Sequence, residues 1–254
     1  MISSSGTVCH KLTLWQELSD FWRFFRHADL RRLPGRRADS GVASDWWPGI
    51  SIGKLFAWAG ILWALNFVVL GPLAVMAATS GGAEHRMDVV SVPWMTAIFW
   101  APLIEEMLFR YGLRRPRQAL WVCPAMLPSL LWGAQGWVMA WTACVLLLAC
   151  LPLRQGHIKQ AGWRRGWRRY YGHRFPWVYH LSALIFAGVH LNNFQLADTP
   201  FLMLPLLVLP QWSAGLVLGW MRVRRGIGAS MMLHGLFNAG PVLLILLISN
   251  QAGS

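Results

Sequence analysis

The sequence predicts an all-helical (all-α), polytopic membrane bundle of about seven transmembrane helices with a cytoplasmic N-terminus. Three observations lead to this prediction. The composition is strongly apolar, the apolar residues fall in runs long enough to cross a bilayer, and the basic residues fall on one side of those runs. Of the 254 residues, 56% are hydrophobic, 13% are charged and 17 are Trp. This composition is typical of an integral membrane protein and unusual for a soluble one.

A membrane-spanning helix needs about 20 mostly apolar residues. Runs of about this length lie at 55–78, 92–113, 119–153, 177–195, 201–221 and 227–249. The run at 119–153 would be about 50 Å long as one helix, against a hydrocarbon core of about 30 Å. We therefore expect it to form a tight helical hairpin that turns near GAQG, residues 133–136, which brings the number of spans to seven.

The distribution of Lys and Arg supports this hairpin, because cytoplasmic loops of membrane proteins are enriched in both. With the N-terminus inside, four basic regions fall on one side and only Arg86 falls outside them. They carry eight, four, seven and three basic residues, and they lie before the first span and at 110–117, 154–175 and 222–225. The C-terminus is then external. The formal charge of +13 is explained by topology and by contact with anionic lipids, so we expect no nucleic-acid partner.

Residues 1–54 form a predicted cytoplasmic segment, and residues 55–254 form the bundle. Residues 14–33 place Leu and aromatic residues at near-helical spacing with Arg between them, which predicts an amphipathic interfacial helix. It would lie either on the inner leaflet or against the protein's own loops. Residues 34–49, rich in Pro, Gly and Ser, predict a linker. The basic, Trp-rich loop at 154–175 is expected to contact lipid.

The stretch APLIEEMLFR, residues 101–110, places two carboxylates inside an apolar run. A charge at the centre of a membrane helix costs at least about 2.5–3.5 kcal/mol, and such residues usually face the bundle interior and mark function. Arg110 lies four residues after Glu106 on the same helical face, so we expect these two to form an ion pair. Adjacent helical residues point about 100° apart. Glu105 therefore needs a partner on another helix.

Candidates for that partner lie in two other spans, His190 in FAGVHLNN and His234 with Asn238 in MLHGLFNAG. His234 and Asn238 are four residues apart and project from one helical face. Glu105 and His234 each lie about 12 Å from the cytoplasmic ends of their spans, so they can meet at one depth. An intramembrane His or Asn alone is more often a helix-to-helix hydrogen bond, but the joint occurrence of these groups in three spans favours a functional site.

His190 fits that depth less well, because it lies about 20 Å from Trp177 at the start of its run. We therefore expect Tyr179 and His180 to form an interfacial turn, with hydrocarbon beginning only near Leu181. This adjustment would bring His190 closer to the depth of the other groups.

The chemistry that fits two carboxylates, two imidazoles and an amide is hydrolysis. A desolvated carboxylate is a better base, and Glu105 with His190 can hold and deprotonate a water. His234 and Asn238 can donate hydrogen bonds to the oxyanion of a tetrahedral intermediate. These motifs contain no Ser or Cys with an adjacent base, so an activated water fits better than an acyl-enzyme.

In order along the chain, EEMLFR, FAGVH and HGLFN resemble the EExxxR, FxxxH and HxxxN motifs of the CPBP or Abi family. That family comprises intramembrane endopeptidases, among them type II CAAX prenyl proteases and proteins of bacteriocin processing and immunity. The resemblance covers about residues 90–245. It implies two catalytic pairs and one supporting pair: Glu105 with His190 to activate water, His234 with Asn238 to form the oxyanion hole, and Glu106 with Arg110 to support them.

The family was once described as metal-dependent, and Glu105, His190 and His234 would make a plausible zinc set. We favour metal-free catalysis and expect no cofactor. The predicted protein is an intramembrane endopeptidase of a bacterial inner membrane that acts on a peptide or protein substrate. Two alternatives stay open. One is a non-catalytic protein of the same fold that acts through a partner in immunity, maturation or secretion. The other is a proton-coupled transporter, for which the sequence lacks paired broken helices.

Overall fold

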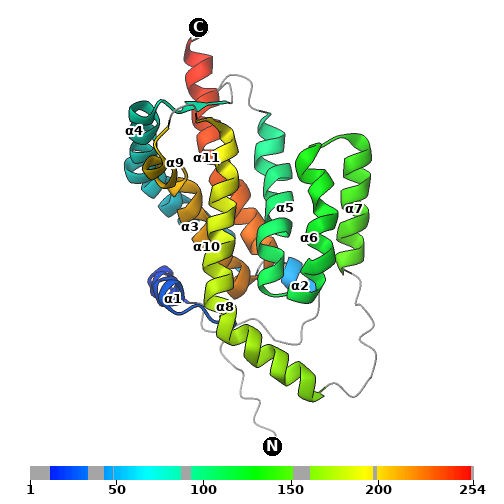
Figure 1. Ribbon diagram of the computed structural model, residues 1–254. Coiled ribbons are helices and arrows are strands. Elements are labelled where there is room, and N and C mark those ends of the chain that lie inside the picture. Colours follow the sequence, from blue (N-terminus) through cyan, green and yellow to red (C-terminus); the bar gives the residue numbers. More distant parts are fainter. Residues whose placement is uncertain are drawn as a thin grey trace, which may run out of the picture.

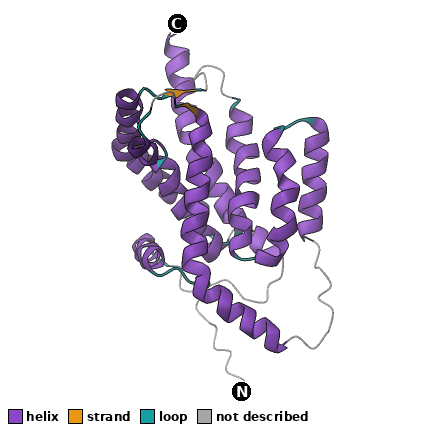
Figure 2. Ribbon diagram, viewed as in Figure 1, coloured by secondary structure: helices purple, strands orange, loops and turns teal. Residues whose placement is uncertain are grey.

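The computed structural model describes residues 12–33, 43–47, 49–86, 93–150, 161–196 and 199–252. The described chain forms α1 Leu14–Arg26, α2 Ala43–Trp46, α3 Ile52–Leu65, η1 Asn66–Leu70, α4 Gly71–Gly81, β1 Glu84–His85, η3 Thr96–Trp100, α5 Ala101–Glu105, η4 Glu106–Arg110, η5 Tyr111–Leu113, α6 Pro116–Leu131, α7 Gly136–Cys150, α8 Ala161–Val189, η6 His190–Asn193, β2 Phe194–Gln195, η7 Phe201–Met203, α9 Leu204–Leu207, α10 Leu209–Arg225 and α11 Ile227–Ala252. It is a helical bundle in which α1 lies across the lower end (Figure 1). The two strands pair antiparallel near the other end (Figure 2).

The bundle is all-helical and carries helices of membrane-spanning character. Among the described residues, Ile52–Gly81 and Ile227–Leu244 are long and apolar enough to cross a membrane. A third candidate is the pair Phe201–Leu207 and Leu209–Arg225, which is bent by 49°. The bend interrupts the continuous span expected at 201–221, since Pro210 has no amide hydrogen to continue the helix. The total of seven spans and the cytoplasmic N-terminus stay predictions.

The hairpin predicted within 119–153 is present. Helix α6 ends at Leu131 and α7 begins at Gly136. Gly133 adopts a φ of 69°, a left-handed conformation that costs glycine least. The hydroxyl groups of Ser129 and Thr142 lie 2.6 Å apart between the two helices. A buried polar contact thus fixes the register of the hairpin.

The segment that carries the two carboxylates, Thr96 to Leu113, changes its helical register along its length. A π-helical turn, η3, comes directly before Ala101 and Pro102. A proline ring clashes with the carbonyl four residues earlier in a regular α-helix, and the wider turn relieves this clash. The same arrangement occurs in η1, directly before Gly71 and Pro72. Such π-turns are frequent at functional sites.

Helix α8 is longer than the apolar run 177–195 that the sequence indicated, and it bends between its lower and upper parts (Figure 1). It begins at Ala161, inside the predicted 154–175 loop, and it continues without a break through Tyr179 and His180. The helix thus begins well before the apolar run, and the entry into hydrocarbon near Leu181 stays a prediction. The Tyr179 side chain is buried and its hydroxyl donates to the Leu216 carbonyl 2.8 Å away, so the residue packs between helices.

Two glycines allow α10 to approach α8 closely. A β-carbon at Gly219 would lie 2.8 Å from the Tyr179 ring, and one at Gly215 would lie 3.2 Å from the Phe186 ring. Small residues four apart commonly line such helix contacts in membranes, because they let the backbones come together. The rings of Tyr179 and Phe186 on α8 therefore occupy the space that the two glycines leave on α10.

Helix α1 is shorter than the predicted 14–33 helix. Thr13 and Gln16 form a capping box at its start, and it ends at Arg26. Beyond it, the Asp29 carboxylate accepts from the backbone N–H and the guanidinium of Arg31, which favours a turn over further helix. Phe24 of α1 belongs to the same core as residues of α3, α8 and α10. The described part of segment 1–54 thus packs against the bundle.

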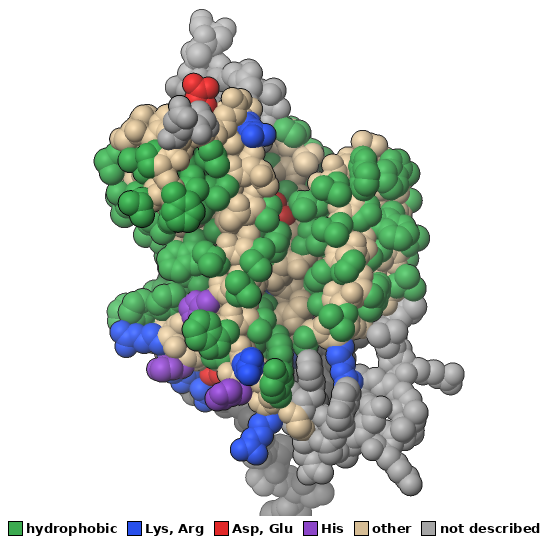
Figure 3. Space-filling view, viewed as in Figure 1, with side chains coloured by type: hydrophobic (Ala, Val, Ile, Leu, Met, Phe, Trp, Pro, Cys, Tyr) green, Lys and Arg blue, Asp and Glu red, His purple; other side chains and the backbone are tan. Residues whose placement is uncertain are grey.

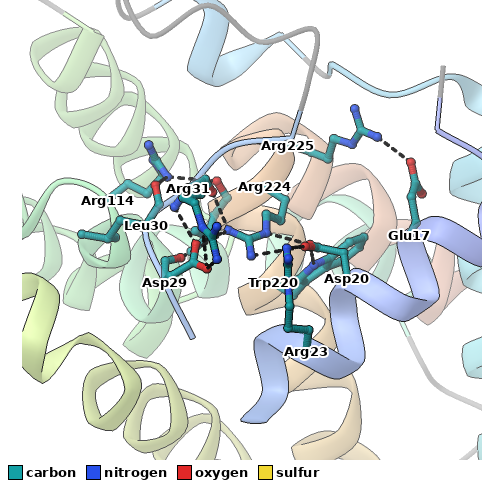
Figure 4. A network of polar contacts seen from close by, with 11 residues as sticks. Glu17, Asp20, Arg23, Asp29, Leu30, Arg31, Arg114, Trp220, Arg224 and Arg225 are labelled. Carbon is teal, nitrogen blue, oxygen red and sulfur yellow. Dashed lines mark hydrogen bonds and ion pairs between the residues drawn. The ribbon is translucent and has the colours of Figure 1, made fainter. Parts of the chain in front are cut away.

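Ion pairs hold this segment to the end of α10, and Figure 4 shows most of them. Arg224 pairs with Asp20 at 2.8 Å and with Asp29 at 2.7 Å. We call the full set the N-terminal clasp; it joins three arginines of α10, Arg222, Arg224 and Arg225, to four acidic residues, Glu17, Asp20, Asp29 and Asp45.

The clasp gives the three basic residues of the predicted 222–225 turn a role within the protein. The side chains of Arg222, Arg224 and Arg225 are buried inside the protein. Burial alone would raise the pKa of the Asp29 carboxyl, but its hydrogen bonds to Arg224 and Arg31 hold the pKa well below its usual range. The basic side chains visible on the surface in Figure 3 lie mainly at this lower end.

Candidate active site

The two carboxylates of the APLIEEMLFR stretch lie where α5 passes into η4, and they differ in exposure. Glu106 is fully buried, whereas 17% of the Glu105 side chain is exposed. Nη1 of Arg110 lies 3.0 Å from Oε1 of Glu106, which confirms the predicted ion pair. The Arg110 guanidinium also lies over the Phe186 ring, 3.7 Å from its centroid. Charge and an aromatic face together hold this buried cation.

His234 of α11 connects the two carboxylates. Its Nδ1 lies 3.0 Å from Oε1 of Glu106, and its Nε2 lies 3.6 Å from Oε2 of Glu105. The expectation that Glu105 has a partner on another helix is therefore confirmed. Since Nδ1 donates to the buried carboxylate, the imidazole is held in one orientation and its Nε2 is directed toward the more exposed carboxylate.

The Phe186 ring links the two histidines. Its centroid lies 4.6 Å from the His190 ring and 5.8 Å from the His234 ring, in edge-on contacts. His190 stands just after the end of α8, and its Nδ1 lies 2.8 Å from the Phe186 carbonyl. Donation from Nδ1 to that carbonyl leaves Nε2 as the hydrogen-bond acceptor. The Phe186 ring thus contacts both histidines and the Arg110 guanidinium, which places His190 beside the same cluster.

Asn238 lies one turn beyond His234 and contacts the other side of the carboxylate segment. Its Nδ2 donates to the Ala97 carbonyl at 2.9 Å. Ala97 lies in the π-turn η3, where the donor five residues on would be Pro102, which has no amide hydrogen. The asparagine thus satisfies a backbone acceptor that the proline leaves free, and a second N–H on Nδ2 is available for another acceptor.

Ser230, on the same face of α11 one turn before His234, is a site residue that the sequence reasoning missed. Its hydroxyl contacts Oε2 of Glu106 and lies 2.9 Å from the Leu218 carbonyl. Phe186 was quoted within its motif but received no role. The spacing of four residues offered a signal in both cases, because Ser230 precedes His234 and Phe186 precedes His190 by one helical turn.

The zinc set considered from sequence does not form a ligand cluster. Within the described ranges, no group of three or more His, Cys, Asp or Glu side chains is arranged to hold a metal ion. Glu105, His190 and His234 lie in one region, and Nδ1 of each histidine is directed at an oxygen of the protein, which leaves Nε2 of each ring for a water or another ligand.

The site is open on one side of the bundle. The face in Figure 3 is hollowed where α8 passes α5, and the red of an acidic side chain is visible at the bottom of the hollow. Of the two acidic residues in the carboxylate segment, Glu105 is the one that keeps some exposure. The side chains on either side of this hollow are largely hydrophobic (Figure 3).

Comparison with known proteins agrees with the motifs. The family model described as type II CAAX prenyl endopeptidase Rce1-like matches residues 88–240, more than half of the chain. The chain belongs to this Rce1-like family. No curated protein and no solved structure matches it significantly. The matched range contains all three motifs and leaves α1 to α4 outside. Membership of a protease family, together with the apolar helices, indicates an integral membrane protein of the hydrolase class.

Proposed function

We propose that the protein is an intramembrane endopeptidase that hydrolyses a peptide bond with a water activated by Glu105 and His190. The observation that supports this most is the position of His234, whose two ring nitrogens face two carboxylates of different exposure. A purely structural ion pair would need only Glu106 and Arg110. Glu105 and His190 are not needed for that pair, and activation of a water would account for their presence.

In the proposed reaction, Glu105 takes a proton from the water, whose oxygen attacks the carbonyl carbon of the scissile bond. His190 accepts a hydrogen bond from that water through Nε2, since its Nδ1 is directed at the Phe186 carbonyl. The tetrahedral intermediate collapses, the C–N bond breaks, and the proton passes from Glu105 to the leaving nitrogen. The products are an amine and a carboxylic acid, which loses its proton to solvent at neutral pH.

The oxyanion of the intermediate would accept hydrogen bonds from His234 and Asn238. His234 would donate to the oxyanion through Nε2 while its Nδ1 stays directed at the Glu106 carboxylate, so this step needs a hydrogen on both ring nitrogens. Asn238 would use the N–H that is not donated to Ala97. Donors of this kind are worth about 2.7–4 kcal/mol each in other enzymes. The imidazole of His234 is oriented by Glu106, which is itself held by Arg110 and Ser230.

The test uses the full-length protein in detergent with two substrates, a prenylated CAAX peptide chosen for the matched family and a membrane-peptide library. Wild type is compared with Glu105→Gln, and with Glu84→Gln as the control for an exposed carboxylate outside the site. Each is assayed with and without a chelator. Cleavage that is lost only in Glu105→Gln and is insensitive to chelator supports the proposal.

Three other outcomes would contradict it. Cleavage retained in Glu105→Gln would remove the proposed base. Cleavage abolished by chelator would assign the water to a metal. Absence of cleavage by the wild type on both substrates would favour the non-catalytic alternative, in which the same fold acts through a partner.

A further inference from the structure

One face of helix α1 is buried, and its acidic side chains have partners within the protein. Asp20 pairs with Arg224 and accepts a hydrogen bond from the Trp220 indole at 2.9 Å. Glu17 accepts from the Trp58 indole at 3.1 Å and pairs with Lys54 at 2.9 Å. These contacts fix α1 to α3 and to α10, and Figure 4 shows those with α10.

The opposite face of α1 is exposed and unusually aromatic. Trp15 is 76% exposed and Trp22 is 53% exposed. The Arg26 guanidinium lies over the Trp22 ring, 4.8 Å from its centroid, and Trp22 stacks on Phe25. A short helix that exposes two indoles beside a cation has the composition of a membrane-surface helix.

The two flanks of this exposed face differ in polarity. At about 100° per residue, Leu18 and Trp22 project from one flank of α1, while Gln16 and Arg23 project from the other. An apolar flank and a polar flank on either side of the buried face are what a helix needs to lie flat at a membrane surface.

The contacts of α1 show which flank faces the membrane. Phe25, on the apolar flank, contacts His180 of α8. In the antiparallel pair of α8 and α10, the neighbouring Tyr179 lies beside Leu216 and Gly219, further into the bundle than Arg224. The apolar flank therefore points toward the spanning part of the bundle, and the flank with Arg23 points toward its end.

The apolar flank is continuous with the lipid-facing surface of the bundle. Ile52 and Phe56, on the first turns of α3, are 65% and 52% exposed, and Leu181 of α8 is 56% exposed. Helix α1 contacts both of these helices, through Glu17 with Lys54 and through Phe25 with His180. One apolar surface thus passes from the two helices onto α1.

We propose that α1 lies in the head-group layer of the membrane at the lower end of the bundle and binds anionic phospholipid there. Leu18 and Trp22 face the acyl chains, and Arg26 contacts the phosphate groups. The charge of the chain, +13, and the exposed cations of α1 match an anionic surface. This inference does not depend on the proposed peptidase activity, so either can fail without the other.

The test measures the depth of spin labels in the full-length protein, reconstituted in nanodiscs of phosphatidylglycerol or of phosphatidylcholine. Labels are attached at Trp22→Cys and, as the matched control one residue on, at Arg23→Cys, in a background whose four native cysteines are replaced by Ser. Depth is read from collisions with oxygen, which concentrates in lipid, against a nickel chelate, which stays in water. Trp15→Cys and Gln16→Cys form a second pair if the first does not fold.

In phosphatidylglycerol discs we expect the label at position 22 to collide preferentially with oxygen and the label at position 23 with the nickel chelate. Phosphatidylcholine discs, or the additional change Arg26→Gln, should make the label at 22 several-fold more accessible to the chelate. Equal chelate access at both positions would overturn the membrane contact. Equal depth in both lipids would overturn the anionic preference, and shielding from both reagents would indicate a protein partner in place of lipid.

Discussion

Arg222 of α10 donates through Nε to the carbonyl oxygen of Arg110 at 3.2 Å, at the very end of the turn that carries Glu106. Its Nη2 lies 3.3 Å from the Tyr111 carbonyl, and its Nη1 pairs with Asp45 at 2.6 Å. Carbonyls at the end of a helix lack some of their partners within the helix. The Tyr111 carbonyl also accepts from the backbone N–H groups of Arg114 and Arg115. Arg222 adds a cation from another helix at this point, and the N-terminal carboxylate of Asp45 neutralises that cation.

The first prediction concerns this arrangement. Asp45→Asn should lower the free energy of unfolding by about 3 kcal/mol, because removing one partner of a buried ion pair leaves the other charge uncompensated. Asp29→Asn is the matched control and should cost less, since 27% of the Asp29 side chain is exposed. Unfolding in mixed micelles measures both. Equal losses in the two variants would show that burial does not decide the cost.

The second prediction concerns pH. Burial alone would raise the pKa of Asp45, but Arg222 and Arg115 lower it to about 2. A carboxyl whose folded pKa is depressed stabilises the fold above its unfolded pKa of about 3.9, and this contribution is lost as pH falls toward the folded value. Thermal stability should therefore be steady from pH 7 to about 4.5 and should decline below that. Asp45→Asn should show a shallower decline, and identical slopes would contradict the assignment.

The third prediction concerns the contact of α8 with α10. Gly219→Ala places a β-carbon 2.8 Å from the Tyr179 ring and should destabilise the protein by about 1–3 kcal/mol through overpacking. Gly188→Ala, in α8, meets no atom within 4 Å and should be neutral or mildly stabilising, since Ala is the better helix former. A neutral Gly219→Ala would mean that the two helices can separate freely.

The fourth prediction separates the two glutamates. Glu106→Gln should cost about 3 kcal/mol or more in stability, because it leaves the buried Arg110 uncompensated. Glu105→Gln should change stability by no more than about 1 kcal/mol, because this side chain is partly exposed and its contact with His234 is long. Peptidase activity should be lost in both. If Glu105→Gln unfolded the protein as much as Glu106→Gln does, the division of roles would be wrong.

Local spacing explains why part of the site could be predicted from sequence. The pair of Glu106 with Arg110 depends on an i, i+4 relationship, which any helix satisfies. The partnership of Glu105 with His234 followed from depth and from the need to compensate a charge in the membrane. Both arguments use only the helical repeat and the cost of burial.

Other features could not be predicted, for physical reasons that differ from case to case. The π-turns depend on how a helix avoids a proline ring, and several solutions exist. The early start of α8 could not be predicted, because its first residues lie outside the apolar run. The clasp joins residues up to 208 positions apart, and no periodicity signals such a pairing. The sequence assigned its arginines to a basic loop and gave no sign that they are buried.

That separation along the chain gives the clasp arginines two successive tasks during biosynthesis. Asp20 is made 204 residues before Arg224, which takes a ribosome about 10–40 s at 5–20 residues per second. Until α10 has been inserted, the carboxylates of the first segment have no arginine from α10 to bind. With the predicted cytoplasmic N-terminus, we expect Arg222, Arg224 and Arg225 to retain their end of α10 on the cytoplasmic side as it is inserted. In the folded protein the same side chains are paired with carboxylates and buried, so they would first direct insertion and then close the finished protein.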